Sequence, residues 1–178
     1  GKRVQYRVEK FASYANVPLL AMRLSIEVQD QAEVVLSCGV DGRIWSLNGE
    51  HFSRYEPFVD KEKLGIETET YEFGIQVDVV AGLRLVEGEA VEMGIKETKR
   101  RIMKWYRFEL DPGERVVLEQ VMVVCHSNRV SEPRQAALEQ AGTALKAGFD
   151  ALLADHQAKW DPIWEMSDIQ IEGNLESQ

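Results

Sequence analysis

The chain has 178 residues, of which 44% are hydrophobic and 29% are charged, a balance typical of one soluble globular domain. Its formal net charge of −9 disfavours nucleic acids and anionic membranes as partners, because phosphate groups attract surfaces rich in Lys and Arg. No apolar run approaches the roughly 20 residues that a membrane-spanning helix needs. A neutral small molecule or another protein fits this composition better.

Residues 3 to about 128 show one β-strand pattern after another. The ranges 17–28 and 32–40 are apolar on both alternating faces, as expected for strands inside a two-layer sandwich. Asp41-Gly42 is typical of a tight hairpin turn, because glycine tolerates a positive φ. Asp111-Pro112-Gly113 predicts a second turn. Further strands are expected at 66–73, 74–80, 90–95, 102–110 and 115–124, giving about nine in all.

After Asn128 the hydrophobic period changes to that of a helix. Ser131 as N-cap and the early Pro133 predict its start, and Gly142 and Gly148 are weak points at which it can break. The residues that recur at steps of three and four predict a single apolar stripe: Leu138, Ala141, Leu145, Phe149, Leu152, His156 and Trp160.

The last segment predicts an end to this helix. Pro162 is expected to start a fresh turn, and Ile169 and Ile171 alternate again as in a strand. The fold class is therefore mainly β: an antiparallel β-sandwich over 1–130, followed by a helical linker over 131–178. Because the strand pattern begins almost at once after Gly1 and an ordered-looking segment runs to Gln178, we expect the chain to be cut from a longer protein.

No catalytic signature stands alone in the sequence. Cys125 and His126 are neighbours in a strand, so their side chains point to opposite faces and cannot form a catalytic pair. The three histidines have no ligand partner at metal-binding spacing. Four carboxylates would align if all were helical, but a solvated helix face is the more ordinary interpretation: Asp161, Glu165, Asp168 and Glu172. We expect no catalytic residue and no metal site here.

The cysteines and the absence of secretion signals indicate a reducing compartment. Cys38 and Cys125 each lie in an apolar run and are expected to be buried, reduced thiols. A disulfide would require their strands to lie side by side, which the sequence does not decide. With no signal peptide and no Asn-x-Ser/Thr site, these features favour the cytoplasm.

Flat aromatic side chains leave two interpretations open. Trp45, Trp105 and Tyr106 lie on strands, where they could stack on sugar rings, although packing in the core is more common. Trp160 and Trp164 are four residues apart on one helix face, which predicts packing against a neighbouring domain.

Three stretches carry a resemblance to a known family. Residues 9–13 and 17–23 are similar to the pattern E-R-F-x-S … L-A-x-R, and residues 37–45 to S-G-x-D-G-R-x-x-N. Residues 156–173 are similar to H-x-x-x-W … W … S-D-I-x-I-E-G, the most specific of the three because the spacing is kept. These patterns resemble glycoside hydrolase family 65, the maltose, kojibiose and trehalose phosphorylases. Ser46 and Asn174 depart from the family's Asn and Asp.

The resemblance implies an N-terminal supersandwich-like domain, a helical linker, an (α/α)6 barrel and a small C-terminal sheet domain. It also implies that the sandwich is partial here, because the family's opening before the stretch matched by residues 9–13 is missing. Such enzymes cleave α-glucosidic bonds of disaccharides with inorganic phosphate, invert the anomeric carbon and release β-glucose 1-phosphate. They need no cofactor, since phosphate is a co-substrate. The family's catalytic and phosphate-binding residues would lie in the barrel, beyond Gln178, so the chain alone is expected to be inactive.

The implied partners are therefore an α-linked glucose disaccharide, phosphate, the barrel of the same polypeptide and a second subunit in a homodimer. Trp160, Trp164 and Asp168 are the residues expected near the barrel junction, with the stripe from Leu138 to Trp164 lying against barrel helices. A free-standing carbohydrate-binding sandwich and a related hydrolase that uses water remain the alternatives.

Overall fold

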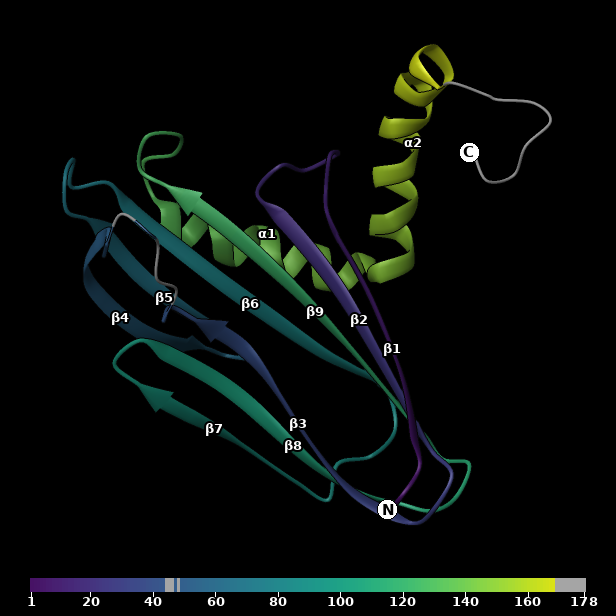
Figure 1. The fold of residues 1–178 in the computed structure, drawn as a ribbon. Coiled ribbons are helices and arrows are strands. Elements are labelled where there is room, and N and C mark those ends of the chain that lie inside the picture. The colour runs from purple at the N-terminus through teal and green to yellow at the C-terminus, as the bar shows by residue number, and fades with distance from the viewer. Residues whose placement is uncertain (44–46, 48, 169–178) are drawn as a thin grey trace.

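The computed structural model describes residues 1–43, 47 and 49–168, and in this part of the chain it contains nine strands followed by two helices (Figure 1). The strands are β1 (Val4–Ala12), β2 (Leu19–Val28), β3 (Ala32–Asp41), β4 (Phe52–Asp60), β5 (Lys63–Thr70), β6 (Gln76–Glu87), β7 (Glu92–Thr98), β8 (Arg101–Leu110) and β9 (Arg115–His126). The helices are α1 (Pro133–Ala147) and α2 (Phe149–Ser167).

The strands form two antiparallel sheets, which confirms the predicted sandwich. The large sheet has the order β1-β2-β9-β6-β5-β4, and the small sheet has the order β3-β8-β7. The two sheets face one another, and α1 lies across the outer face of the large sheet (Figure 1). The described chain therefore has three layers: small sheet, large sheet and helix.

The alternation of side chains along β9 builds two separate cores. Val116 and Leu118 face the small sheet and lie in the core between the sheets. Val121 and Val123 point the other way, into a second core beneath α1. Three fully buried alanines on α1 let the helix approach this face closely: Ala137, Ala141 and Ala144. Because both faces of β9 are covered, its sequence is nearly continuously apolar.

The hairpin predicted at Asp41-Gly42 is wrong. β3 pairs with β8, and β4 belongs to the other sheet, so the chain crosses between sheets here. Gly42 is needed for space, since a Cβ would lie 3.0 Å from the Arg100 carbonyl oxygen and 3.1 Å from the Tyr55 ring. Asp41 binds the Arg43 guanidinium at 2.7 Å, and this hydrogen bond lowers the pKa of Asp41 to about 2.

The helical region breaks at Gly148, one of the two predicted weak points, and continues through Gly142. Its N-cap is Glu132 and not Ser131, with Pro133 at the first turn as predicted. Pro162 lies inside α2, so the predicted fresh turn is wrong. A proline removes one backbone donor without forcing a stop. Here α2 continues past the proline to Ser167, with the Trp160 and Trp164 rings 6.0 Å apart on either side of it in sequence.

The break also corrects the predicted single apolar stripe. Leu138, Ala141 and Leu145 pack on the large sheet of this chain, so they do not face an absent barrel. Phe149 is buried and Leu152 packs against the same core, so only the later part of α2 is left to contact other structure. α2 leaves the sheet at a steep angle to α1 (Figure 1), and Phe149 is its only buried residue.

We expect Gly148→Ala to destabilise the chain by about 1–3 kcal/mol. Gly148 has φ 82° and ψ 164°, a conformation that is essentially restricted to glycine, and a Cβ would lie 2.5 Å from Arg84 Nη2. The matched control is Gly142→Ala. Gly142 lies inside α1, and a Cβ there would lie 3.4 Å from Cε of the flexible Lys63 side chain, so the substitution should stabilise the chain by about 0.5–1 kcal/mol. Urea denaturation measures both; equal effects of the two substitutions would contradict this account.

Candidate functional site at the elbow between the helices

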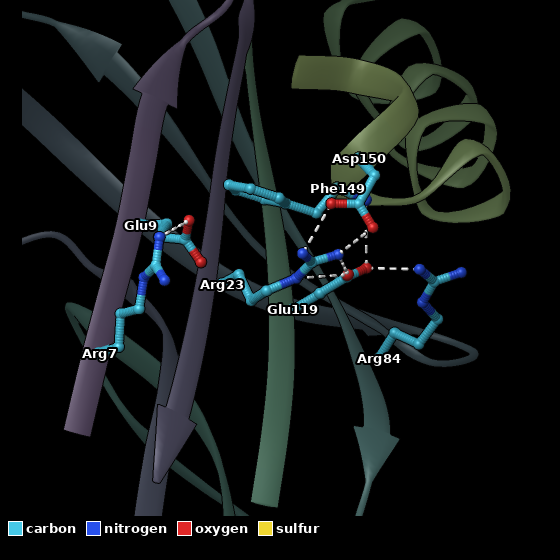
Figure 2. Close-up of polar contacts among 7 residues, drawn as sticks. All are labelled: Arg7, Glu9, Arg23, Arg84, Glu119, Phe149 and Asp150. Atoms are coloured by element: carbon cyan, nitrogen blue, oxygen red, sulfur yellow. Dashed lines mark hydrogen bonds and ion pairs between the residues drawn. The ribbon is translucent and has the colours of Figure 1, made fainter. Parts of the chain in front are cut away.

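A buried carboxylate lies under the elbow between α1 and α2. Glu119, at the centre of β9, is 3% exposed and faces the helix layer. Its Oε1 accepts hydrogen bonds from Arg23 Nη2 at 2.7 Å and Arg23 Nε at 3.1 Å. Its Oε2 accepts from Arg84 Nη2 at 2.5 Å and from the Phe149 backbone N–H at 3.3 Å (Figure 2). Both oxygens are therefore satisfied, as a buried charge requires.

The arginines extend this network to both helices. Arg23 donates from Nη1 to Asp150 Oδ1 at 2.7 Å and from Nη2 to Asp150 Oδ2 at 2.8 Å, a bidentate pair in the first turn of α2. These bonds raise the pKa of Arg23 and lower the pKa of Asp150. Arg84 Nη1 donates to the Leu145 carbonyl oxygen in the last turn of α1 at 3.2 Å. The elbow is thus clamped to β2, β6 and β9.

The opposite end of α1 is attached in a similar way. Arg134 Nη2 donates to Glu67 Oε2 at 2.8 Å, its Nε lies 3.6 Å from Asp78 Oδ1, and its guanidinium stacks 4.2 Å from the Phe58 ring centre. Asp78 is fully buried, and burial raises the pKa of its carboxyl, while Gln76 donates a hydrogen bond to Oδ2 at 2.7 Å. Arginine–carboxylate pairs therefore fix both ends of α1 to the large sheet.

An aromatic cluster lines the side of α2 that faces β1. The Phe11 and His156 rings lie 4.9 Å apart, and Tyr14 and Trp160 lie 5.0 Å apart. The Tyr14 backbone N–H donates to His156 Nδ1 at 3.1 Å. Trp164 continues the row towards the end of α2 but is 57% exposed. A shallow hollow over this row is open to solvent.

The structure places the predicted junction residues together at the far end of α2. Trp160 and Trp164 share one face, and Asp168 follows the last turn, where its backbone N–H donates to the Trp164 carbonyl oxygen at 2.8 Å. Their role at a barrel junction stays a prediction. Glu119 and Arg23 were not identified from the sequence. The one available signal was a lone acid at a helix-facing position in the apolar run of β9.

The proposed sugar-stacking aromatics do not form one surface. Tyr106 faces the inter-sheet core and is 4% exposed. Trp105 points to the other side of β8, where its ring covers Gly94. Trp45 lies outside the described residues.

The described residues show neither a metal-binding cluster nor a membrane-spanning helix. Within 1–43, 47 and 49–168, no group of three or more His, Cys, Asp or Glu side chains is arranged to hold a metal ion. Neither α1 nor α2 is long and apolar enough to cross a bilayer. Cys38 and Cys125 are buried free thiols, as predicted, and the structure places them in different cores.

The sequence matches the profile of the Glycosyl hydrolase family 65, N-terminal domain, over residues 1–163. The chain belongs to this family. This family 65 domain is 27% identical to 1,2-alpha-glucosylglycerol phosphorylase of Bacillus selenitireducens. The match spans the whole of this chain and 23% of that protein. It is 24% identical to kojibiose phosphorylase of Halothermothrix orenii, over 93% of this chain and 23% of that protein. Nigerose phosphorylase of Lachnoclostridium phytofermentans is 19% identical over 94% of this chain, which covers 25% of it.

A solved structure supports the fold of the family 65 domain. A protein assigned as a kojibiose phosphorylase from the human microbiome superposes with a TM-score of 0.85 over 97% of this chain and 23% of its own, at 16% sequence identity. The chain therefore spans about a quarter of the length of the proteins that it matches.

Two of the stretches that resemble the family meet in space. Phe11, from the first stretch, contacts His156, from the last. Arg23, which ends the first stretch, binds Asp150 just before the last stretch begins. The family-like residues of the family 65 domain thus converge on the elbow and on the face of α2 that follows it.

We expect Glu119→Gln to lower the free energy of unfolding by about 3 kcal/mol, because it leaves Arg23 and Arg84 facing a neutral group in a buried site. Glu87→Gln serves as the control. It alters an exposed ion pair between Glu87 and Arg115, whose side chains are 45% and 49% exposed, and should cause no measurable change in the free energy of unfolding. Guanidinium titrations measure both variants. A Glu119→Gln midpoint equal to that of the control would contradict the assignment.

Asp78 should make stability depend on pH. Burial raises the folded-state pKa of Asp78 above its ordinary value of 3.8, so the folded chain holds this proton more tightly than the unfolded chain. The free energy of unfolding should therefore fall as the pH rises from about 4 through the raised pKa. Asp78→Asn should remove this decrease, as measured by denaturation at several pH values. Identical pH profiles for the two proteins would show that Asp78 is not the group responsible.

Proposed function

We propose that this family 65 domain is the non-catalytic N-terminal part of an inverting disaccharide phosphorylase, and that it braces the catalytic region. The observation that carries the proposal is α2, which is firmly clamped at its base and carries an exposed aromatic face beyond it. The three relatives described above are all phosphorylases, which supports the reaction class.

The reaction of the whole protein would use inorganic phosphate as the nucleophile. A carboxylic acid protonates the leaving glycosidic oxygen, while phosphate attacks the anomeric carbon from the opposite face and gives β-glucose 1-phosphate. Phosphate is already anionic, so it needs no second carboxylate as base. We assign none of these roles to residues 1–178 and place them in an (α/α)6 barrel that follows the linker.

The linker would join this barrel through the far end of α2. Trp160, Trp164 and Asp168 are the residues that we propose lie at the junction. Trp164 is 57% exposed at the end of the tryptophan row, which is suited to an apolar partner surface. We also propose a cytoplasmic setting, which the buried free thiols of Cys38 and Cys125 support.

Assays with and without phosphate test the reaction class. This chain alone, incubated with phosphate and maltose, kojibiose, nigerose, trehalose or glucosylglycerol, should release no glucose 1-phosphate. The longer natural protein should release it from at least one of these substrates. Glucose without glucose 1-phosphate would identify a hydrolase, and turnover by residues 1–178 alone would contradict the bracing role.

Trp164→Ala should separate a junction role from a role within the domain. In this chain Trp164 is 57% exposed, so its loss should leave the melting temperature nearly unchanged. In the longer protein, the same substitution should cost about 3 kcal/mol, as expected for an aromatic side chain removed from a packed site. Phe73→Ala, at an 83% exposed aromatic on the β5–β6 turn, is the control for both proteins. If Trp164→Ala affects the longer protein no more than Phe73→Ala does, the junction lies elsewhere.

A further inference from the structure

Part of the outer face of the large sheet lies beyond the two helices. α1 packs on β6 and β9, and towards the amino terminus β1, β2, β9 and β6 continue past the elbow (Figure 1). A hollow of about 440 Å³ lies on this part of the face, and its lining comes from the same four strands. This volume falls within the range of small-molecule sites, roughly 300–1,000 Å³.

Short side chains form the floor of the hollow, and longer ones surround them. Ser25 of β2 pairs with Arg7 of β1 on one side and with Val117 of β9 on the other, so these side chains lie in one row on the outer face. The two neighbouring rows hold longer side chains: Gln5, Glu27 and Arg115 in one, and Glu9, Arg23 and Glu119 in the other. Val117 is 5% exposed, as expected for a floor between taller neighbours. The strand register therefore explains why the surface is hollowed at this point.

Two arginine–glutamate pairs form opposite sides of the hollow. Arg7 Nη2 donates to Glu9 Oε1 at 2.8 Å on β1 (Figure 2). On the other side of Ser25, Arg115 Nε of β9 donates to Glu87 Oε2 of β6 at 3.0 Å. A guanidinium has more N–H donors, and a carboxylate more lone pairs, than one such pair uses. Both pairs therefore keep donors and acceptors for a ligand.

Arg23 forms a fixed end of the hollow, next to the elbow. Its side chain is 20% exposed and is held by Glu119 and Asp150, so it cannot move without leaving the Glu119 carboxylate uncompensated. The side chains of Arg7 and Arg115 are 75% and 49% exposed and can adjust their positions. A ligand would therefore meet one rigid side and two sides that can close on it.

Two further polar side chains are available at this surface. In the described part of the chain, the side chains of Gln5 and Ser25 form no hydrogen bond, although both line the hollow. The amide of Gln5 and the hydroxyl of Ser25 can each donate and accept. The lining therefore offers donors and acceptors along its whole length.

The charges of the lining balance, and this restricts the class of ligand. Three arginines and three glutamates line the hollow: Arg7, Arg23, Arg115, Glu9, Glu27 and Glu87. An anion would meet as many carboxylates as guanidinium groups, and the net charge of −9 disfavours it further. An apolar ligand would remove water from these charged groups without replacing its hydrogen bonds. A neutral ligand with many hydroxyl groups avoids both costs, because each hydroxyl donates and accepts.

We propose that this hollow is a binding site for a short neutral oligosaccharide. Neighbouring hydroxyl groups of a sugar ring match an arginine–glutamate pair, because one can accept from the guanidinium while the next donates to the carboxylate. The pairs on either side of Ser25 would hold the sugar above this serine, with Arg23 at one end. The inference rests on these side chains and does not depend on the reaction proposed above.

An NMR titration of this chain locates the site. Maltose, maltotriose, trehalose and cellobiose would each be added at millimolar concentrations to the isotope-labelled chain. At least one sugar should shift the amide signals of residues 5–9, 23–27 and 115–117, and inorganic phosphate should leave them in place. No shift with any of the sugars, shifts confined to other strands, or displacement of the sugar by phosphate would overturn the proposal.

Two substitutions test the assigned side chains. Arg7→Gln removes a guanidinium from an exposed position and should weaken sugar binding about tenfold, as expected for lost hydrogen bonds to a charged group. Ser25→Leu fills the floor and should abolish binding. Arg3→Gln is the matched control, because Arg3 is 73% exposed, pairs with Asp30 and does not line the hollow.

The spectrum of each variant without sugar shows whether it is folded, and the exposed Arg7→Gln substitution decides the matter if Ser25→Leu is not. Arg3→Gln should bind as the parent chain does. If Arg7→Gln binds sugar as tightly as Arg3→Gln, or if a folded Ser25→Leu binds as the parent does, the sugar does not occupy this hollow. Because the readout is binding to this chain, it can fail while the phosphorylase reaction of the longer protein is confirmed, and the reverse.

Discussion

The buried carboxylate of Glu119 is the constraint on which the arrangement of this domain depends. A charge at the centre of a sheet must be neutralised, and here that requirement brings Arg23, Arg84 and the Phe149 backbone to one point. Arg23 then binds Asp150 and Arg84 binds the end of α1. The bonds that neutralise Glu119 within the sheet therefore also determine where α1 ends and in which direction α2 begins.

The two helices differ in how they are attached to the sheet. α1 lies flat because small alanines let it approach the sheet. Glu67 also holds its first turn through Arg134, and Arg84, paired with Glu119, holds its last turn. α2 is clamped at its base and is supported along one side by Phe11 and Tyr14, while Trp164 near its far end is exposed. A helix with a rigid base and an exposed face is suited to holding a partner that packs on it at a fixed position relative to the sandwich. The membership in family 65 agrees with a domain of this kind.

The sequence predicted the local features and missed the distant ones. The period-two pattern identified the strands, and Gly148 marked the helix break, because these depend on neighbouring residues. The hairpin prediction at Asp41-Gly42 was wrong because the sequence does not show whether a glycine is required for space or for a turn. The Glu119 network joins residues up to 127 positions apart, so only the fold reveals it. The convergence of the two family-like stretches was hidden for the same reason.

The direction of α2 relative to the sandwich can be measured in this chain by electron–electron double resonance. Spin labels at Lys159 of α2 and Lys96 of β7 occupy exposed positions, while the native thiols of Cys38 and Cys125 are buried. The account predicts one narrow distance distribution in the parent chain and a broad or shifted one after Glu119→Gln. A distribution that stays narrow and unmoved in the variant would contradict the claim that the buried carboxylate sets the elbow.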